Sequence, residues 1–143
     1  MKKIIILISI VIIIVTLVAF KYAEYQNEYN KILKYNLEFE ENYQKEIYGI
    51  DLTTIINKVI NNNEKNNVEK GQDKKYINNN TNSINIEIKI TDTNEVYSME
   101  TFYNGGIEQF VQNYGSIQFK CTKIEYHKKT GKVSYLYFEQ ISK

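Results

Sequence analysis

The sequence predicts an α+β protein with a long N-terminal helix, a short second helix and a small antiparallel β-meander of three to five strands. Three observations support this class. An unbroken apolar run, Ile4 to Phe20, leads into a helical stripe of aromatic residues. A second apolar stripe with spacings of three and four follows in residues 52–60, and from Ile84 onward the pattern alternates with period two, as in half-buried strands.

The apolar run predicts that residues 1–21 form a transmembrane signal anchor. It contains no charge, proline or glycine, and it meets the lower limit of about 17 residues for crossing a bilayer. Lys3 and Lys21 flank it and can reach the two interfaces. The run is longer than the 7 to 15 apolar residues of a typical cleaved secretory signal, for which the best cleavage site would follow 17–19.

The residues around the apolar run do not match two other N-terminal processing signals. A pilin-like leader needs a glycine just before the apolar run and a glutamate just inside it, and neither is present. A lipoprotein signal needs a cysteine at the end of the run, and the single cysteine, Cys121, is far from it. The expectation is therefore an uncleaved anchor, with the cleaved signal and the pilin-like leader as alternatives.

Lysine placement predicts the orientation in the membrane. The amino terminus, Lys2 and Lys3 form a dense cluster on one side, whereas lysines are spread along the chain on the other side. Dense positive charge favours the cytoplasmic side. The expected arrangement is a single-pass protein of the plasma membrane with a cytoplasmic N-terminus and an extracytoplasmic C-terminal domain.

Residues 22–48 are predicted to form a helical stem that continues out of the membrane. Apolar and aromatic side chains recur with spacings of three and four, at Tyr22, Tyr25, Tyr29, Ile32, Asn36, Phe39 and Tyr43. This pattern allows a coiled coil that pairs copies of the chain, with Asn36 fixing the register. Leu33, Tyr35 and Leu37 widen the stripe, which favours docking of the stem on its own domain.

Residues 49–143 form the predicted α+β domain. Gly49 is expected to end the stem, and Asp51 to cap a short helix that ends near Asn62. Residues 61–83 are polar and rich in asparagine, which predicts a mobile loop or an irregular edge hairpin around Lys70 to Asp73.

The remaining segments predict the sheet. Strands are expected at 84–90, 96–99, 117–126 and 133–139, because apolar and polar residues alternate there. Residues 104–114 have helical spacing after Gly105-Gly106, and turns are expected at 91–95 and 128–131.

Composition argues against nucleic-acid binding. The net charge is +1, and all 18 basic residues are lysine. Arginine, the preferred side chain for bidentate contacts to phosphate and guanine, is absent. A single cysteine also means that no disulfide forms within the chain.

No group of residues points to catalysis, a metal or a cofactor. Cys121 and His127 lie six residues apart on one expected strand, roughly 20 Å at about 3.3 Å per residue, so a nucleophile pair fails on geometry. Residues 92–95 lack the glycine and terminal glutamate of a calcium loop. Gly105-Gly106 is not followed by the lysine of a phosphate loop. Residues 79–81 match the glycosylation triplet, and in such an asparagine-rich chain this match is attributed to chance.

Two stretches resemble small single-pass membrane-anchored proteins of low-GC, Clostridia-type bacteria. They are residues 49–58, GIDLTTIINK, with NEKN at 63–66, and residues 119–127, FKCTKIEYH. The resemblance implies location and architecture, and no activity. The order of apolar helix, stem, loop and sheet also resembles type IV pilins in architecture.

The functional prediction is a non-enzymatic, membrane-anchored extracytoplasmic module of the bacterial cell envelope, with a binding or structural role. Its expected partners are the lipid bilayer, through the N-terminal helix, and an envelope protein or a second copy of the chain, through the stem. A pilin-like assembly subunit and an unrecognised envelope enzyme are the alternatives.

Overall fold

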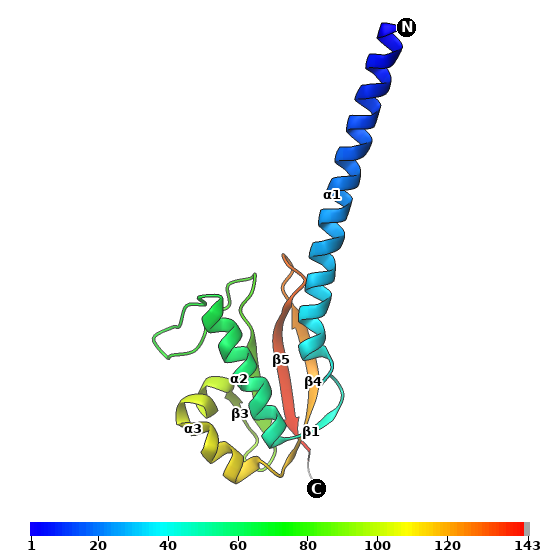
Figure 1. Ribbon diagram of the computed structural model, residues 1–143. Helices are drawn as coiled ribbons and strands as arrows, with labels where there is room; N and C mark the ends of the chain where they lie inside the picture. Colours follow the sequence, from blue (N-terminus) through cyan, green and yellow to red (C-terminus); the bar gives the residue numbers. More distant parts are fainter. Residues whose placement is uncertain (142–143) are drawn as a thin grey trace. The chain divides into compact units, whose positions relative to one another are not determined.

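The computed structural model describes residues 1–141 and confirms the α+β class. Its elements are α1 (Lys2–Glu40), β1 (Glu46–Tyr48), α2 (Gly49–Lys65), β2 (Asn85–Ile90), β3 (Glu95–Ser98), α3 (Met99–Tyr114), β4 (Gln118–Tyr126) and β5 (Val133–Gln140) (Figure 1). The chain divides into two compact units, residues 1–35 and the part that starts at Asn36. Each is described separately below.

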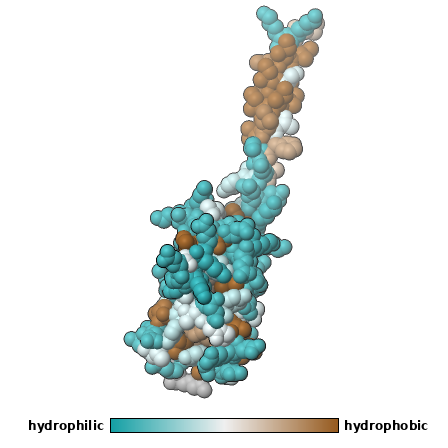
Figure 2. Space-filling view, turned by 90° about the vertical axis from the view of Figure 1, so that its left-hand side faces the viewer, coloured by the Kyte–Doolittle hydropathy of each residue, from teal (hydrophilic) through white to brown (hydrophobic). Residues whose placement is uncertain are grey.

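The first unit is the N-terminal part of α1, and it contains the apolar run. None of the run's side chains is buried, and its most apolar window has a mean hydropathy of 3.1. Its two polar side chains are satisfied within the helix, since the hydroxyl of Ser9 donates to Ile5 O (2.9 Å) and that of Thr16 to Ile13 O (3.2 Å). Figure 2 shows the run as a brown hydrophobic band with hydrophilic side chains beyond its end. This helix is long and apolar enough to be a membrane anchor or a signal sequence.

The second unit is a five-stranded sheet in the order β1-β4-β5-β2-β3. The sheet is mixed, so the predicted antiparallel meander is wrong in one respect: β2 and β5 are parallel, and they lie side by side at the centre. The other pairs are antiparallel. Alternation predicts that a segment is a strand but carries no information about which strand it pairs with.

The core lies between one face of the sheet and the helices α2 and α3 (Figure 1). The sheet contributes alternate residues, which are the fully buried Ile86, Ile88, Ile90, Phe119, Cys121, Leu136 and Phe138. The apolar stripe of α2 meets them with Leu52, Ile55, Ile56, Val59 and Ile60, and α3 adds Met99 and Phe110. The opposite face carries the polar alternates of the strands, such as Glu87, Lys89 and Tyr135.

The predicted helical stem at 22–48 is helical only as far as Glu40. The chain turns at Gln44, which has a positive φ of 61°, and its backbone N–H donates to Cys121 O (2.9 Å). Residues 46–48 then pair with β4 as the edge strand β1. Pairing with β4 satisfies backbone groups of both strands, and this tertiary pairing overrides the helical spacing of Tyr43.

The last turns of α1 are part of the folded domain. Asn36 and Phe39 are buried, and the Asn36 amide donates to Gly131 O (2.8 Å) while its oxygen accepts the Val133 N–H (2.9 Å). Asn36 therefore contacts the β4–β5 turn of its own chain. Oligomerisation through the stem stays a prediction. Docking of residues 22–35 stays a prediction.

The start of α2 differs from the predicted one. The helix begins at Gly49, Tyr48 occupies the cap position, and no side chain caps it, so Asp51 lies in the first turn and is not the cap. The connection after α3 takes over this role, because the N–H groups of Gly49 and Ile50 donate to Ile117 O (2.8 Å) and Gly115 O (3.2 Å). Backbone carbonyls from a distant segment therefore replace the expected side chain.

The asparagine-rich segment is partly structured. Helix α2 extends to Lys65, past the predicted end near Asn62, and residues 70–76 form a small hairpin with a bridge between Lys70 and Tyr76. A hairpin therefore lies where the sequence predicted a loop or an edge hairpin, but it is not part of the sheet. Mobility of this segment stays a prediction. The helix predicted at 104–114 is the second part of α3, which has a kink at Gly106 (φ 99°). The first part of α3, which begins at Met99, was not predicted.

Candidate functional site

A hollow of about 260 Å³ lies where β3 separates from β2. The last β3 residue, Ser98, pairs with Glu87, so the first β2 residues, Asn85 and Ile86, have no β3 partner. The chain leaves the sheet here to enter α3, and residues 75–76 of the small hairpin lie alongside. The hollow is thus bounded by β2, by the first turn of α3 and by the hairpin.

The lining contains two carboxylates. Glu100, in the first turn of α3, is only 6% exposed, and its Oε1 accepts the backbone N–H of Tyr76 (3.1 Å). Glu87, on the open face of β2, accepts the hydroxyl of Tyr135 at Oε2 (2.7 Å). Burial and, secondarily, the bond to Glu87 raise the pKa of Tyr135. The Tyr135 hydroxyl therefore stays a hydrogen-bond donor to Glu87 at any physiological pH.

The second oxygen of each carboxylate is free in the part of the chain that the structure describes. Glu100 Oε2 and Glu87 Oε1 accept no hydrogen bond from residues 1–141. Over the same residues, no fully buried side-chain nitrogen or oxygen lacks a partner. The Glu100 oxygen is therefore reached by solvent, and Glu87 is an exposed residue. Both side chains line the hollow.

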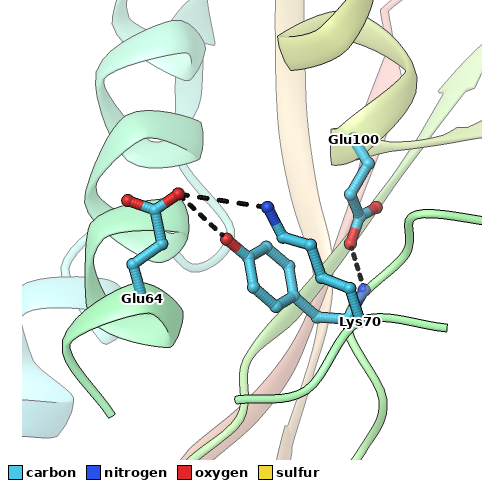
Figure 3. Close-up of polar contacts among 4 residues, drawn as sticks. Glu64, Lys70 and Glu100 are labelled. Atoms are coloured by element: carbon cyan, nitrogen blue, oxygen red, sulfur yellow. Dashed lines mark hydrogen bonds and ion pairs between the residues drawn. The ribbon is translucent and has the colours of Figure 1, made fainter. Parts of the chain in front are cut away.

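A polar cluster holds the hairpin wall of the hollow in place. The Tyr76 ring is 5% exposed, and its hydroxyl donates to Glu64 Oε1 on α2 (3.4 Å). The Lys70 ammonium lies 4.5 Å from the centre of this ring and 4.0 Å from the same Glu64 oxygen. Figure 3 shows Glu64 and Glu100 reaching the hairpin from two different helices.

The pKa shifts in this cluster agree with its geometry. The bond to Tyr76 raises the pKa of Lys70, and burial raises the pKa of Tyr76. Both groups therefore keep their protons at neutral pH, and the pair remains an ammonium beside a neutral phenol. The Lys70–Glu64 ion pair itself is long and exposed and contributes little to stability.

Cys121 and His127 are engaged separately. The Cys121 thiol is buried on the helix side of β4, and its Sγ lies 3.6 Å from Lys123 O. His127 lies one residue beyond β4 at the turn, buried, with Nε2 2.7 Å from Ser83 O. The two side chains have different hydrogen-bond partners, and among the described residues no hydrogen bond joins them as a nucleophile pair.

Cys121 should be unreactive in the folded protein. Burial raises the pKa of the Cys121 thiol from 9.0 to about 11, so the thiolate fraction near pH 8 is about 100-fold lower than in the unfolded chain. Iodoacetamide labelling, followed by mass spectrometry, should be slow in buffer and fast in denaturant. Because the folded pKa is the higher one, the thiol's contribution to stability is full below about pH 9 and is lost as pH rises towards 11. Equal labelling rates in the two states would contradict this placement.

The other residues singled out from the sequence serve local structure. Residues 91–94 form the β2–β3 turn, where Asn94 has a positive φ of 53° and the Asp92 carboxylate accepts from Gln140 (3.1 Å). Asp73 accepts the Lys75 N–H within the hairpin (3.1 Å), and the Asn79 amide oxygen accepts three backbone N–H groups from 81–83. Among residues 1–141, no three His, Cys, Asp or Glu side chains are grouped so that they could hold a metal.

Sequence reasoning missed both carboxylates of the hollow. In the sequence, Glu87 looks like any polar residue on the solvent face of a strand. Glu100 looks like a solvent-exposed residue that follows a strand. One feature could have drawn attention to Glu100: it lies in the first turn of a helix, where the helix dipole favours a carboxylate. That signal does not indicate burial.

Comparisons with known proteins gave no match: no family model, no curated protein and no solved structure is similar to this chain.

Proposed function

We propose that the chain is a non-enzymatic, membrane-anchored module of the bacterial cell envelope that holds a binding domain outside the plasma membrane. The observation that carries this proposal is the apolar run of α1, which buries none of its side chains within the protein. At about 1.5 Å per residue the run spans about 26 Å, close to the hydrocarbon thickness of about 30 Å. The lysines at both ends, and the resemblance to small single-pass proteins of low-GC bacteria, support the same reading.

The binding role is proposed from the domain. Its sheet has one face covered by α2 and α3, and the hollow beside Glu87 and Glu100 offers unused hydrogen-bond acceptors to solvent. Against a Cys–His enzyme stands the buried thiol of Cys121, whose raised pKa keeps it protonated. The ligand or envelope partner would meet the domain on the extracytoplasmic side.

The unbroken course of α1 favours one second candidate, a pilin-like assembly subunit. α1 runs from Lys2 to Glu40 without interruption, and its last turns are buried in the folded domain at Asn36 and Phe39. A filament subunit needs such a continuous helix. It would also need removal of a leader at the N-terminus.

Membrane fractionation of the full-length chain with a C-terminal tag tests the proposal. The tagged protein should resist alkaline extraction from membranes, and its tag should be digested by protease in intact cells. Replacing Ile12 by Lys places a charge at the centre of the run at a cost of about 2.5–3.5 kcal/mol, so this variant should lose membrane retention, whereas Ile12→Leu should not.

The mature N-terminus separates the alternatives. Intact mass and N-terminal sequencing should find a chain that begins at or near Met1. A chain that begins at Ile4 or Ile5 would replace the anchor by the pilin-like candidate, and one that begins near Phe20 would make the domain a secreted protein. A tag protected in intact cells and digested only after lysis would overturn the orientation.

A further inference from the structure

We propose that the hollow between β2, the first turn of α3 and the hairpin at 70–76 binds a small organic cation, a primary ammonium group on an alkyl stem. This inference deepens the binding role proposed above by naming the chemistry of the ligand. It rests on the charges that line the hollow, on the unused oxygens of its carboxylates, and on its size.

Charge favours a cation. The lining residues carry two carboxylates, Glu87 and Glu100, and one ammonium, Lys75, so the hollow has a net charge of −1. Two like charges that line the same small hollow repel each other, and a bound cation relieves that repulsion. An anionic ligand would add to it.

Hydrogen-bond geometry favours a primary ammonium among cations. Such a group has three donors and no acceptor. Glu87 Oε1 and Glu100 Oε2 accept no hydrogen bond within the described residues, and Asn85 and Ser98 are the other uncharged polar side chains in the lining besides the tyrosines. The two free carboxylate oxygens can therefore accept hydrogen bonds from an ammonium group, and the Tyr135 ring in the lining adds a surface that attracts cations and covers an alkyl stem.

The walls are held in place without a ligand. The Tyr76 N–H fixes one Glu100 oxygen, the Tyr135 hydroxyl fixes one Glu87 oxygen, and the Tyr76 hydroxyl is tied to Glu64. A preorganised site loses less free energy on binding than one that must be ordered by its ligand. The volume of about 260 Å³ lies just below the usual range for small-molecule sites, about 300–1,000 Å³, so the ligand is a side-chain-sized group.

Titration of the full-length protein in neutral detergent tests this proposal. The probe is Nα-acetyl-lysine methylamide, and the matched probe is Nα-acetyl-norleucine methylamide, which has the same stem without the ammonium. We expect saturable binding of the lysine probe at low ionic strength, followed by calorimetry, and no saturable binding of the norleucine probe. Added salt should weaken the binding.

Three variants locate the binding. Glu100→Gln and Glu87→Gln keep the acceptor oxygens for Tyr76 and Tyr135 and remove the charge, so the fold is retained and affinity should fall at least about tenfold. Glu139→Gln is the control, because Glu139 lies on the same sheet face but pairs with Lys89 (3.8 Å) outside the hollow. Its affinity should change less than about twofold.

Several outcomes would overturn the proposal. They are absence of saturable binding up to about 10 mM probe, equal binding of the norleucine probe, and an equal loss of affinity in Glu139→Gln and Glu87→Gln. Unchanged melting temperatures of the glutamine variants show that a loss of affinity is not a loss of fold. Membrane retention is measured separately, so failure here leaves the anchored-module proposal standing.

Discussion

Replacement of Asn63 by alanine is expected to lower the free energy of unfolding by about 2–6 kcal/mol. Asn63 is fully buried near the end of α2, and its side chain makes two hydrogen bonds to the backbone of Ile84. Its amide donates to Ile84 O (2.7 Å), and its oxygen accepts the Ile84 N–H (2.9 Å). Alanine would leave both buried groups of Ile84 without a partner, at about 1–3 kcal/mol each.

Chemical denaturation of the full-length protein in detergent, followed by the near-ultraviolet circular dichroism of its tyrosines, measures this effect. Asn61→Ala is the matched control, since Asn61 lies two residues earlier on the exposed side of α2. It should change stability by no more than about 0.5 kcal/mol. If both variants lose the same stability, the Asn63 side chain does not hold Ile84 in the way described.

Asn63 also illustrates what the sequence could not reveal. It stands in a run of three asparagines that composition alone attributes to a polar loop. The apolar stripe of α2 predicted a helix correctly, but an asparagine after that stripe looks like the helix end. Its partner lies 21 residues away, and no local pattern encodes a contact at that separation.

The sheet shows the same limit from another side. Period-two alternation located β2, β4 and β5 to within a few residues. Successive strand residues face opposite sides of the sheet, so apolar residues on the covered face alternate with polar residues on the open face. The parallel pairing of β2 with β5 was missed, since alternation is the same for either direction. β1 was missed as well, because a three-residue edge strand is too short to show a period.

The hollow could not be predicted for a related reason. Its two carboxylates are 13 residues apart in sequence and come from a strand and a helix, which meet only because β3 is shorter than β2. The apolar run, by contrast, is a local feature, and the sequence alone predicted its helix. Features that depend on composition within one segment were predicted, and features that depend on where two segments meet were not.

Replacement of Gly49 by alanine should destabilise the domain by about 3 kcal/mol or more. A Cβ at this position would lie 2.1 Å from Tyr114 O and 2.8 Å from Tyr114 C, both backbone atoms that cannot move aside as a side chain would. The first turn of α2 therefore has to approach the end of α3 closely, and the N–H of Gly49 confirms this contact by donating to Ile117 O (2.8 Å). Overpacking costs about 1–3 kcal/mol even where side chains can adjust, and here the shift would also strain the bonds that cap α2.

Gly105→Ala is the control for this prediction, because nothing lies within 4 Å of a Cβ at Gly105. This residue lies beside the kink of α3 and has no positive φ of its own, so alanine fits there and the variant should be about as stable as the parent or slightly more stable. Opposite signs for the two glycine variants in the same denaturation experiment are the expected result. If the Gly49→Ala protein is as stable as the parent, α2 and the end of α3 do not pack as closely as described. The backbone carbonyls after α3 would then not be the groups that cap α2.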